Sequence, residues 1–292
     1  MSDGVFHFQI GNFECMAISD GTFVYTDESF FVNAPKKRME QVLRKYDIRS
    51  GEITTPWPSL YINTGKNRIL VDTGAGAGIV PGAGKLLGIL TNEGITVNDI
   101  DTVILTHGHP DHIGGNIDAS GKPAFPNARY YMWKDEWDFW MSKPDLKQLK
   151  LGDELKQFIL ISSQKNLPPI HEQLVLLDNE TEILPGIKAI KAPGHTPGHM
   201  ALAVSSGGEQ LLHISDTVLY PVHMEQPDWY PAFDFEPEQA DVTKHMLLDR
   251  AADEKARVFA FHFPFPCLGY VISKGNRWEW KPIETSGAKD DL

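Results

Sequence analysis

Residues 102–115 carry the densest chemical signal in the chain and read Thr-Val-Ile-Leu-Thr-His-Gly-His-Pro-Asp-His-Ile-Gly-Gly. The first five residues are apolar or β-branched and predict a buried strand. Four potential metal ligands follow it directly, namely His107, His109, Asp111 and His112. Imidazole and carboxylate groups bind Zn²⁺ and related cations, and at this density they can diverge around two adjacent ions. Gly114 and Gly115 predict close packing behind the motif.

Three further side chains of the same kind stand where other predicted strands end. His195 lies in Ala-Pro-Gly-His-Thr-Pro-Gly-His (192–199), Asp216 closes an apolar strand, and His262 follows another. An ionised carboxylate at the end of a buried strand is costly unless it is paired or bound to a metal. Each residue alone could be a core histidine or a helix-capping aspartate. Together with the motif of residues 107–112, they fit one site.

The order H-x-H-x-D-H, then His, Asp and His, resembles that of the metallo-β-lactamase superfamily over about residues 55–265. The resemblance implies an α/β fold, a four-layer αββα sandwich with a dinuclear metal site at the edge between its two sheets. It implies that one metal is held by His107, His109 and His195. It implies that the other is held by Asp111, His112 and His262, with Asp216 bridging the two.

The resemblance also assigns supporting and catalytic roles. Asp72, in Asp-Thr-Gly after an apolar strand, would orient the metal-binding loop, and His199 is expected beside the ligands. An aspartic protease is disfavoured because no second Asp-Thr/Ser-Gly occurs. Asp111 would carry a proton to the leaving group. In related lactonases a tyrosine three residues after the bridging aspartate assists the substrate carbonyl; here that position is Leu219, and Tyr220 is the expected substitute.

The C-terminal part of the chain contains Trp-Tyr-Pro-Ala-Phe-Asp (229–234), an expected helix at residues 237–253 and His-Phe-Pro-Phe-Pro-Cys-Leu-Gly (262–269). Together these stretches resemble the methyl parathion hydrolase and N-acyl-homoserine lactonase branch. This branch suggests a substrate pocket walled by aromatic residues. The pocket candidates are Trp229, Tyr230, Phe263 and Phe265.

The expected activity is hydrolysis of lactones or aryl esters, with quorum-quenching lactonase activity and promiscuous phosphotriester hydrolysis as extensions. The alternative is a thioesterase of the glyoxalase II type, for which Lys274, Arg277 and Lys281 form only a weak basic cluster. Nucleic-acid processing is disfavoured, because the 292 residues contain 27 Lys and Arg against 39 Asp and Glu, a net charge of −12. Redox chemistry with bound iron is a further hypothesis for the function of this fold.

Two divalent metal ions are the expected cofactors, zinc first, with manganese, iron or cobalt as alternatives. Cys15 and Cys267 are the only cysteines, which excludes a disulfide framework. No apolar run reaches the length of a membrane span, and the sequence predicts a cytoplasmic protein without membrane or nucleic-acid partners. We expect one domain over residues 1–292, a small-molecule substrate and a homodimer.

Local patterns predict most secondary structure. Alternating residues 6–25 predict strands with turns at residues 11–12 and 20–21, and further strands are expected near residues 59–63, 68–72, 129–133, 174–177, 187–191, 200–204, 210–215 and 257–261. Helices are expected at residues 85–92, 134–141, 149–163 and 237–253.

Overall fold

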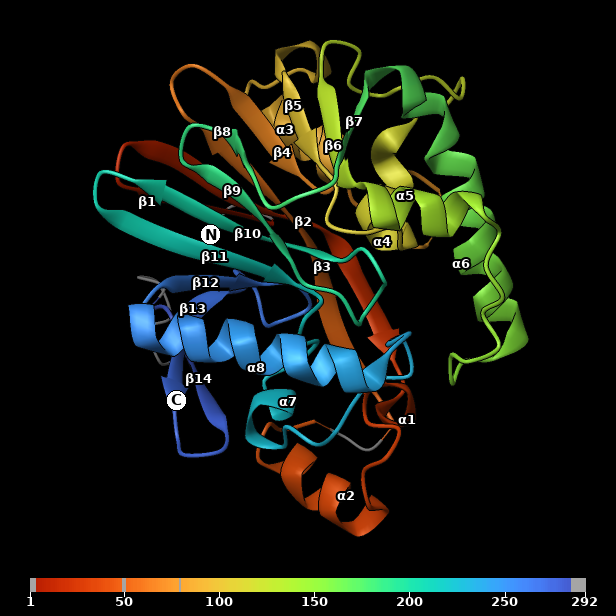
Figure 1. The fold of residues 1–292 in the computed structure, drawn as a ribbon, viewed down its shortest axis with the longest axis vertical. Helices are drawn as coiled ribbons and strands as arrows, with labels where there is room; N and C mark the ends of the chain where they lie inside the picture. The colour runs from red at the N-terminus through yellow and green to blue at the C-terminus, as the bar shows by residue number, and fades with distance from the viewer. Residues whose placement is uncertain (1–3, 49–50, 79, 285–292) are drawn as a thin grey trace.

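Two β-sheets, each built from one continuous part of the chain, organise the computed structural model, which describes residues 4–48, 51–78 and 80–284 (Figure 1). The first sheet has the order β1 (Val5–Ile10), β2 (Phe13–Tyr25), β3 (Ile53–Asn63), β4 (Arg68–Val71), β5 (Thr102–Ile104), β6 (Arg129–Trp133) and β7 (Leu174–Leu177). The second has the order β14 (Trp278–Pro282), β13 (Leu268–Ser273), β12 (Arg257–Ala260), β11 (Glu209–Ser215), β10 (Met200–Ser206), β9 (Ile187–Lys191) and β8 (Glu182–Leu184).

Parallel pairing in each sheet aligns the ends of neighbouring strands that precede the predicted metal ligands. β4 through β7 run parallel to one another, whereas β1 through β4 pair antiparallel. In the second sheet only β11 and β12 pair in parallel among the described strands. Since parallel strands end at the same edge of a sheet, loops that follow β4 and β5, and those that follow β11 and β12, emerge side by side.

The described residues form eight α-helices, some of which cover the outer faces of the sheets. They are α1 (Asp27–Phe30), α2 (Lys36–Arg44), α3 (Leu86–Asn92), α4 (Pro110–Ile113), α5 (Lys134–Met141), α6 (Asp153–Asn166), α7 (Val222–Glu225) and α8 (Pro237–Glu254), with 3₁₀ turns at Val97–Asp99, Gly114–Asn116 and Pro168–Gln173. In Figure 1, α5 and α6 flank the first sheet and α8 lies along the second.

Three apolar layers hold these elements together. One packs α3, α5 and α6 on the first sheet, and includes Leu90, Trp140 and Ile159. A second fills the space between the sheets, and a third packs Leu247 and Leu248 of α8 on the second sheet. Burial of apolar surface on both faces of each sheet requires a covering layer on each side. The predicted four-layer αββα sandwich is therefore confirmed.

The predicted turn at residues 20–21 is wrong, because β2 continues through it with a register shift between Ser19 and Thr22. The cause is the buried side chain of Asp20. Its carboxylate accepts hydrogen bonds from the backbone N–H groups of Ala75, Gly84 and Leu86 at 2.8–3.0 Å. A β-bulge turns this one side chain toward the loop before α3 without ending the strand. Helices α1 and α2 and strands β8, β13 and β14 were not predicted from the sequence.

Within the described parts of the chain, none of the helices combines the length and the apolar character needed to span a bilayer.

Candidate metal centre

Strand ends from both sheets deliver the predicted donors to one place. Asp72 follows β4 and the histidine motif follows β5, so the parallel pairing of these strands brings Asp72 beside the motif, where it accepts from the N–H of Thr106 at 2.8 Å. Asp216 and His262 follow the parallel strands β11 and β12 in the same way. Three of these strand ends carry left-handed backbone, with φ of 60° at Asp72, 43° at Ser215 and 64° at His262. Such strained residues concentrate at functional sites, where surrounding contacts hold them.

The glycines behind the motif have the close neighbours that the sequence predicts. A Cβ atom on Gly114 would lie 1.9 Å from the backbone oxygen of Ala75, and one on Gly115 would lie 2.1 Å from that of Thr73. Only glycine therefore permits the loop after β4 to support the histidine motif.

The first cluster of donors consists of His107, His109 and His195. The Nδ1 atom of His109 lies 3.0 Å from Nε2 of His107 and 3.0 Å from Nε2 of His195. Nitrogens around a tetrahedral zinc lie about 3.3 Å apart, given Zn–N distances of about 2.0–2.1 Å. The cluster therefore has the dimensions of one metal site.

The second cluster consists of Asp111, His112 and His262. Oδ2 of Asp111 lies 3.5 Å from Nε2 of His262 and 3.8 Å from Nε2 of His112. Asp216 lies between the clusters, because its Oδ2 is 3.5 Å from Nε2 of His195 while its Oδ1 is 3.5 Å from Nε2 of His112. A single carboxylate thus reaches both groups of donors.

Unpaired buried atoms indicate that these clusters suit cations. Nε2 of His112 and Oδ1 of Asp216 are buried and have no hydrogen-bond partner among the described residues. Because Nδ1 of His112 lies 2.8 Å from the carboxylate of Asp72 and donates to it, Nε2 is the nitrogen that faces Asp216. A carboxylate oxygen that faces this nitrogen at 3.5 Å needs a positive charge beside it, which either a proton on Nε2 or a metal cation bound by both atoms would supply. The donor set, with its nitrogen and oxygen ligands, therefore fits two divalent metals.

Outer partners orient the donor imidazoles. Besides Asp72, they include Asp234, whose Oδ1 lies 2.8 Å from Nδ1 of His195, and Thr55, whose hydroxyl lies 3.1 Å from Nδ1 of His262. His199 holds the backbone instead, since its Nε2 accepts a hydrogen bond from the N–H of Asp216 at 3.1 Å. Sequence analysis missed Asp234 and Thr55, because neither stands in a motif with its histidine.

Glu136 of α5 joins the two loops that carry the first cluster. Its buried carboxylate accepts hydrogen bonds from the N–H of Gly108 at 2.8 Å and from the N–H of Gly198 at 3.0 Å. It also accepts from the hydroxyl of Thr196 and the indole of Trp140, both at 2.7 Å. Sequence analysis missed this residue too, although a glutamate on the buried face of a predicted helix is a signal that could have found it.

Burial and mutual charge set the protonation of the donors. Burial lowers the pKa of His107 well below its ordinary value, and the neighbouring His112 lowers it further. This favours the neutral imidazole that a metal requires. For Asp216, burial opposes ionisation, yet His112 and His262 hold the pKa of the carboxyl well below its usual range. Burial also raises the pKa of Asp111.

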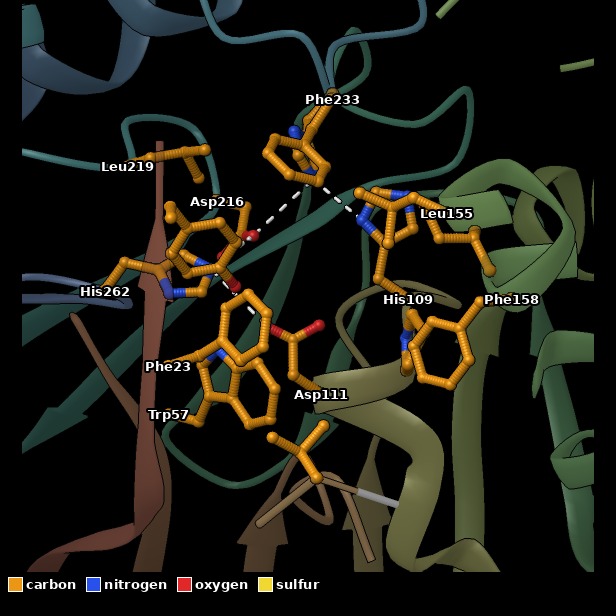
Figure 2. Close-up of a pocket in the computed structure, with 15 residues that line it drawn as sticks. Phe23, Trp57, His109, Asp111, Leu155, Phe158, Asp216, Leu219, Phe233 and His262 are labelled. Carbon is orange, nitrogen blue, oxygen red and sulfur yellow. Dashed lines mark hydrogen bonds and ion pairs between the residues drawn. The ribbon is translucent and has the colours of Figure 1, made fainter. Parts of the chain in front are cut away.

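An apolar cavity opens beside the donors. Figure 2 shows Asp111 between a wall that includes Phe23 and Trp57 and an opposite wall that includes Phe158 of α6, with Asp216 on the side of His262 and Leu219. The other lining residues are Tyr25, Val80, His109, Pro110, Leu155, Ile159, His195, Leu219, Phe233 and His262. Burial, followed by the charge of Asp111, raises the pKa of the Tyr25 phenol well above its ordinary value.

The aromatic residues predicted for the pocket lie elsewhere. Trp229 and Tyr230 line a neighbouring depression that also reaches Asp216. Phe263 is buried under Trp280 at 4.8 Å between ring centroids, and Phe265 packs against the core between the sheets. The walls of the apolar cavity come mainly from β2, β3 and α6, and the alternation of Phe23 and Tyr25 around exposed Val24 is a sequence signal for them.

Tyr220 is also placed away from the cavity that meets the donors. Its ring packs against Tyr46 at 5.9 Å and Phe263 at 6.5 Å, and Leu219 is the residue of this segment that lines the cavity.

The proteins that this chain resembles are consistent with a metal site of this kind. Residues 58–262 match the Metallo-beta-lactamase superfamily. The solved structure of AidC, described as a dizinc quorum-quenching lactonase in complex with a product, is 30% identical, with a TM-score of 0.91, and the match covers 97% of this chain and 99% of AidC. N-acyl homoserine lactonase AiiA of Bacillus thuringiensis subsp. kurstaki is 27% identical over 180 residues, 61% of this chain and 62% of AiiA.

A third relative carries a different activity in its name. Atrochrysone carboxyl ACP thioesterase of Passalora fulva is 28% identical over 181 residues, 61% of this chain and 43% of the thioesterase. The chain thus spans less than two thirds of the length of the curated relatives described here.

The chain belongs to the metallo-beta-lactamase superfamily, as its sequence motifs indicate. Within the superfamily, its similarity to AidC and AiiA supports the lactonase-type branch, whose named members are hydrolases.

Proposed function

We propose that this protein is a metal-dependent hydrolase that opens the ring of N-acyl homoserine lactones. The observation that carries the proposal is a pair of donor clusters joined by Asp216 and placed at the end of an apolar cavity. The names of AidC and AiiA support the same substrate class. Zinc is the proposed metal, because tetrahedral imidazole and carboxylate sites of this size suit it.

When bound, two divalent cations would lower the pKa of a water molecule and polarise the lactone carbonyl. Water adds its oxygen to the carbonyl carbon, the ring C–O bond breaks, and one proton of the water passes to the departing alkoxide. We propose that Asp111 holds that proton in transit, and its position supports this, since its carboxylate lines the cavity and lies beside His262. The product is an open hydroxy acid.

The cavity walls suit an acyl chain rather than a charged group. Leu155 and Phe158 of α6 face Phe23 and Trp57 across the cavity (Figure 2), and none of these four side chains is charged. Burial of apolar surface contributes about 0.8 kcal/mol for each methylene group. We therefore expect longer acyl chains to lower KM until the cavity is filled.

The test is acid release from N-hexanoyl-homoserine lactone, a short-chain homologue, dihydrocoumarin, an aryl ester, an aryl phosphotriester and a glutathione thioester, each with and without chelator. We expect chelator-sensitive turnover with the acyl homoserine lactones as the best substrates. Preference for an aryl ester, a phosphotriester or a thioester by a factor of ten or more would contradict the proposal.

Loss of one donor should remove both metal and activity. Asp216→Ala and His109→Ala are expected to abolish hydrolysis and to lower metal content per chain, while circular dichroism stays that of the parent. His171→Ala, at an exposed histidine, is the matched control. Full activity in either donor variant would overturn the assignment of these residues as ligands.

A thioesterase is the second candidate, favoured by the resemblance to the acyl carrier protein thioesterase. For the glyoxalase II type, the basic residues expected to bind a glutathione carboxylate do not line the cavity. Lys274 pairs with Glu279 at 3.1 Å on the exposed hairpin of β13 and β14, and Arg277 and Lys281 belong to the same hairpin region.

We infer that residues 1–292 act as one domain, because each donor cluster draws on both sheets. The homodimer and the cytoplasmic location stay predictions from the sequence.

A further inference from the structure

We propose that the phenol of Tyr25, on the N-terminal strand β2, donates the hydrogen bond that stabilises the carbonyl oxygen of the substrate as it becomes negatively charged. The inference rests on the proposed hydrolysis and adds a catalytic residue that lies outside the metal-binding motifs. The observation behind the inference is that the hydroxyl oxygen of Tyr25 already accepts one hydrogen bond, while its own hydrogen is not donated to any described protein group. This hydroxyl lies where the cavity meets the metal-binding residues.

Tyr25 lies where the reacting carbonyl would have to bind. It lines the same cavity as Asp111, Asp216 and His262. Its ring centroid is 5.6 Å from that of His262, with the two rings nearly perpendicular. Of the tyrosines in the described residues, it alone lines this cavity.

One hydrogen bond fixes the direction of the phenol. The indole Nε1 of Trp57 donates to the hydroxyl oxygen of Tyr25 at 2.9 Å. Within residues 4–48, 51–78 and 80–284, the Tyr25 hydroxyl donates to no protein acceptor. Since a phenol carries one hydrogen, that hydrogen is available to a substrate oxygen.

Aromatic packing holds the Tyr25 ring before any substrate binds. Its centroid is 4.8 Å from Phe23, 4.8 Å from Phe30 and 5.7 Å from Phe233. A donor fixed in advance stabilises developing charge without a cost of reorganisation. The packing therefore favours a catalytic donor over a mobile surface hydroxyl.

The other phenol near the site does not meet these conditions. Tyr220 contacts Tyr46 and Phe263, and the neighbouring Leu219 takes the place at the cavity wall. The structure therefore assigns the role of hydrogen-bond donor to Tyr25 of strand β2, and not to Tyr220.

The test compares Tyr25→Phe with Tyr46→Phe. Tyr25→Phe keeps the ring and its packing, and we expect kcat for N-hexanoyl-homoserine lactone to fall about 10- to 100-fold, as for loss of one hydrogen bond to a charged group, with KM nearly unchanged. Tyr46→Phe is the control, since its hydroxyl donates to Glu225 at 2.6 Å outside the cavity. Metal content should match the parent in both variants, and each variant should melt somewhat below the parent because it loses one hydrogen bond.

A binding measurement separates this inference from the proposed activity. Hexylphosphonate is a tetrahedral anion that resembles the charge of the transition state, and its Kd can be measured by calorimetry. We expect a weakening of about tenfold or more in Tyr25→Phe and none in Tyr46→Phe. If the parent enzyme fails to open lactones while this weakening is found, the proposed substrate fails and the donor role of Tyr25 stands.

Two results would overturn the role of Tyr25. One is an unchanged kcat and an unchanged phosphonate Kd in Tyr25→Phe when the parent enzyme opens the lactone. The other is a loss of kcat in Tyr220→Phe in place of Tyr25→Phe.

Trp57 is proposed as the positioning residue for this phenol. Trp57→Phe should lower kcat less than Tyr25→Phe does. In the double variant the two effects on kcat should not add, because Trp57 acts through Tyr25. Additive losses would assign Trp57 an independent role in the cavity wall.

Discussion

Asp234 controls a metal-binding imidazole from outside the donor set. Its carboxylate is buried and accepts a hydrogen bond from Nδ1 of His195 at 2.8 Å, so Nε2 of His195 is left free to face the first cluster. Such partners raise the basicity of the ligand and fix its orientation. Asp234 thus keeps His195 in the tautomer that carries its proton on Nδ1.

Asp234→Asn should weaken metal binding about 10- to 100-fold, because an amide accepts this hydrogen bond less strongly and has a second, competing orientation. Competition with a chromophoric chelator would measure the change. Asp228→Asn, at an exposed aspartate in the same segment, is the matched control. Equal affinities in the two variants would contradict a role for Asp234 in orienting His195.

The sequence indicates the site residues that stand in motifs but not those that reach the site through the fold. His107 and His112 lie within six residues of one another, and that density is visible in the sequence. Asp234, Glu136 and Tyr25 stand outside any such cluster, and each also contacts residues that lie far from it along the chain, as Asp234 contacts His195. Long-range contacts follow from sheet topology, which local patterns do not determine.

Helix α5 carries no metal donor, yet it connects the two loops of the first cluster. Its Glu136 bridges the loop after β5 and the loop between β9 and β10, which belong to different sheets. A buried carboxylate is stable only when its oxygens are satisfied, and here four donors satisfy them. The helix therefore fixes the distance between His107 and His195.

Glu136→Gln should lower the free energy of unfolding by about 3 kcal/mol, because its NH₂ group would face N–H and O–H donors that then lose their acceptor. Urea unfolding of the metal-free protein would measure this. Asp138→Ala, on the exposed side of the same helix beside Lys134, should change stability by less than about 1 kcal/mol. A loss in Glu136→Gln no larger than that in the control would be inconsistent with the bridging role.

Strands and helices with a clear hydrophobic periodicity were predicted well, whereas those that depend on tertiary packing were not. β6, β7 and α5 have the predicted bounds, whereas α6 begins and ends a few residues later than predicted. Helices α1 and α2 are short and depend on packing against the segment around Leu219 and Trp229. Tertiary contact, rather than local propensity, stabilises such elements.

For the molecule as a whole, buried neutral histidines make stability depend on pH. Burial lowers the pKa of His223 to about 4, while its Nε2 bonds the backbone oxygen of Phe30 at 2.9 Å. Between that pKa and the unfolded value of about 6.5, the unfolded chain binds a proton that the native chain does not. Stability from this residue is therefore present above about pH 6.5 and is lost as the pH falls toward 4.

When the pH falls from 7 to 5, the free energy of unfolding should decrease by about 2 kcal/mol because of His223. The His223→Gln variant should not show this decrease. Urea unfolding at the two pH values would measure the difference. His171→Gln, at an exposed histidine, should lose as much as the parent on acidification. An identical loss in His223→Gln and the parent would show that the buried imidazole does not carry this dependence.

The division of the chain into two sheets has a consequence for how the protein acquires its cations. The first sheet and its loops supply His107, His109, Asp111 and His112, whereas His195, Asp216 and His262 come from the second. A nascent chain that has formed only its first sheet offers just two donors to each ion, too few to retain one against cellular competitors. Loading must then follow folding, and the metal that fills the site is the one abundant in the compartment where the two sheets finally dock.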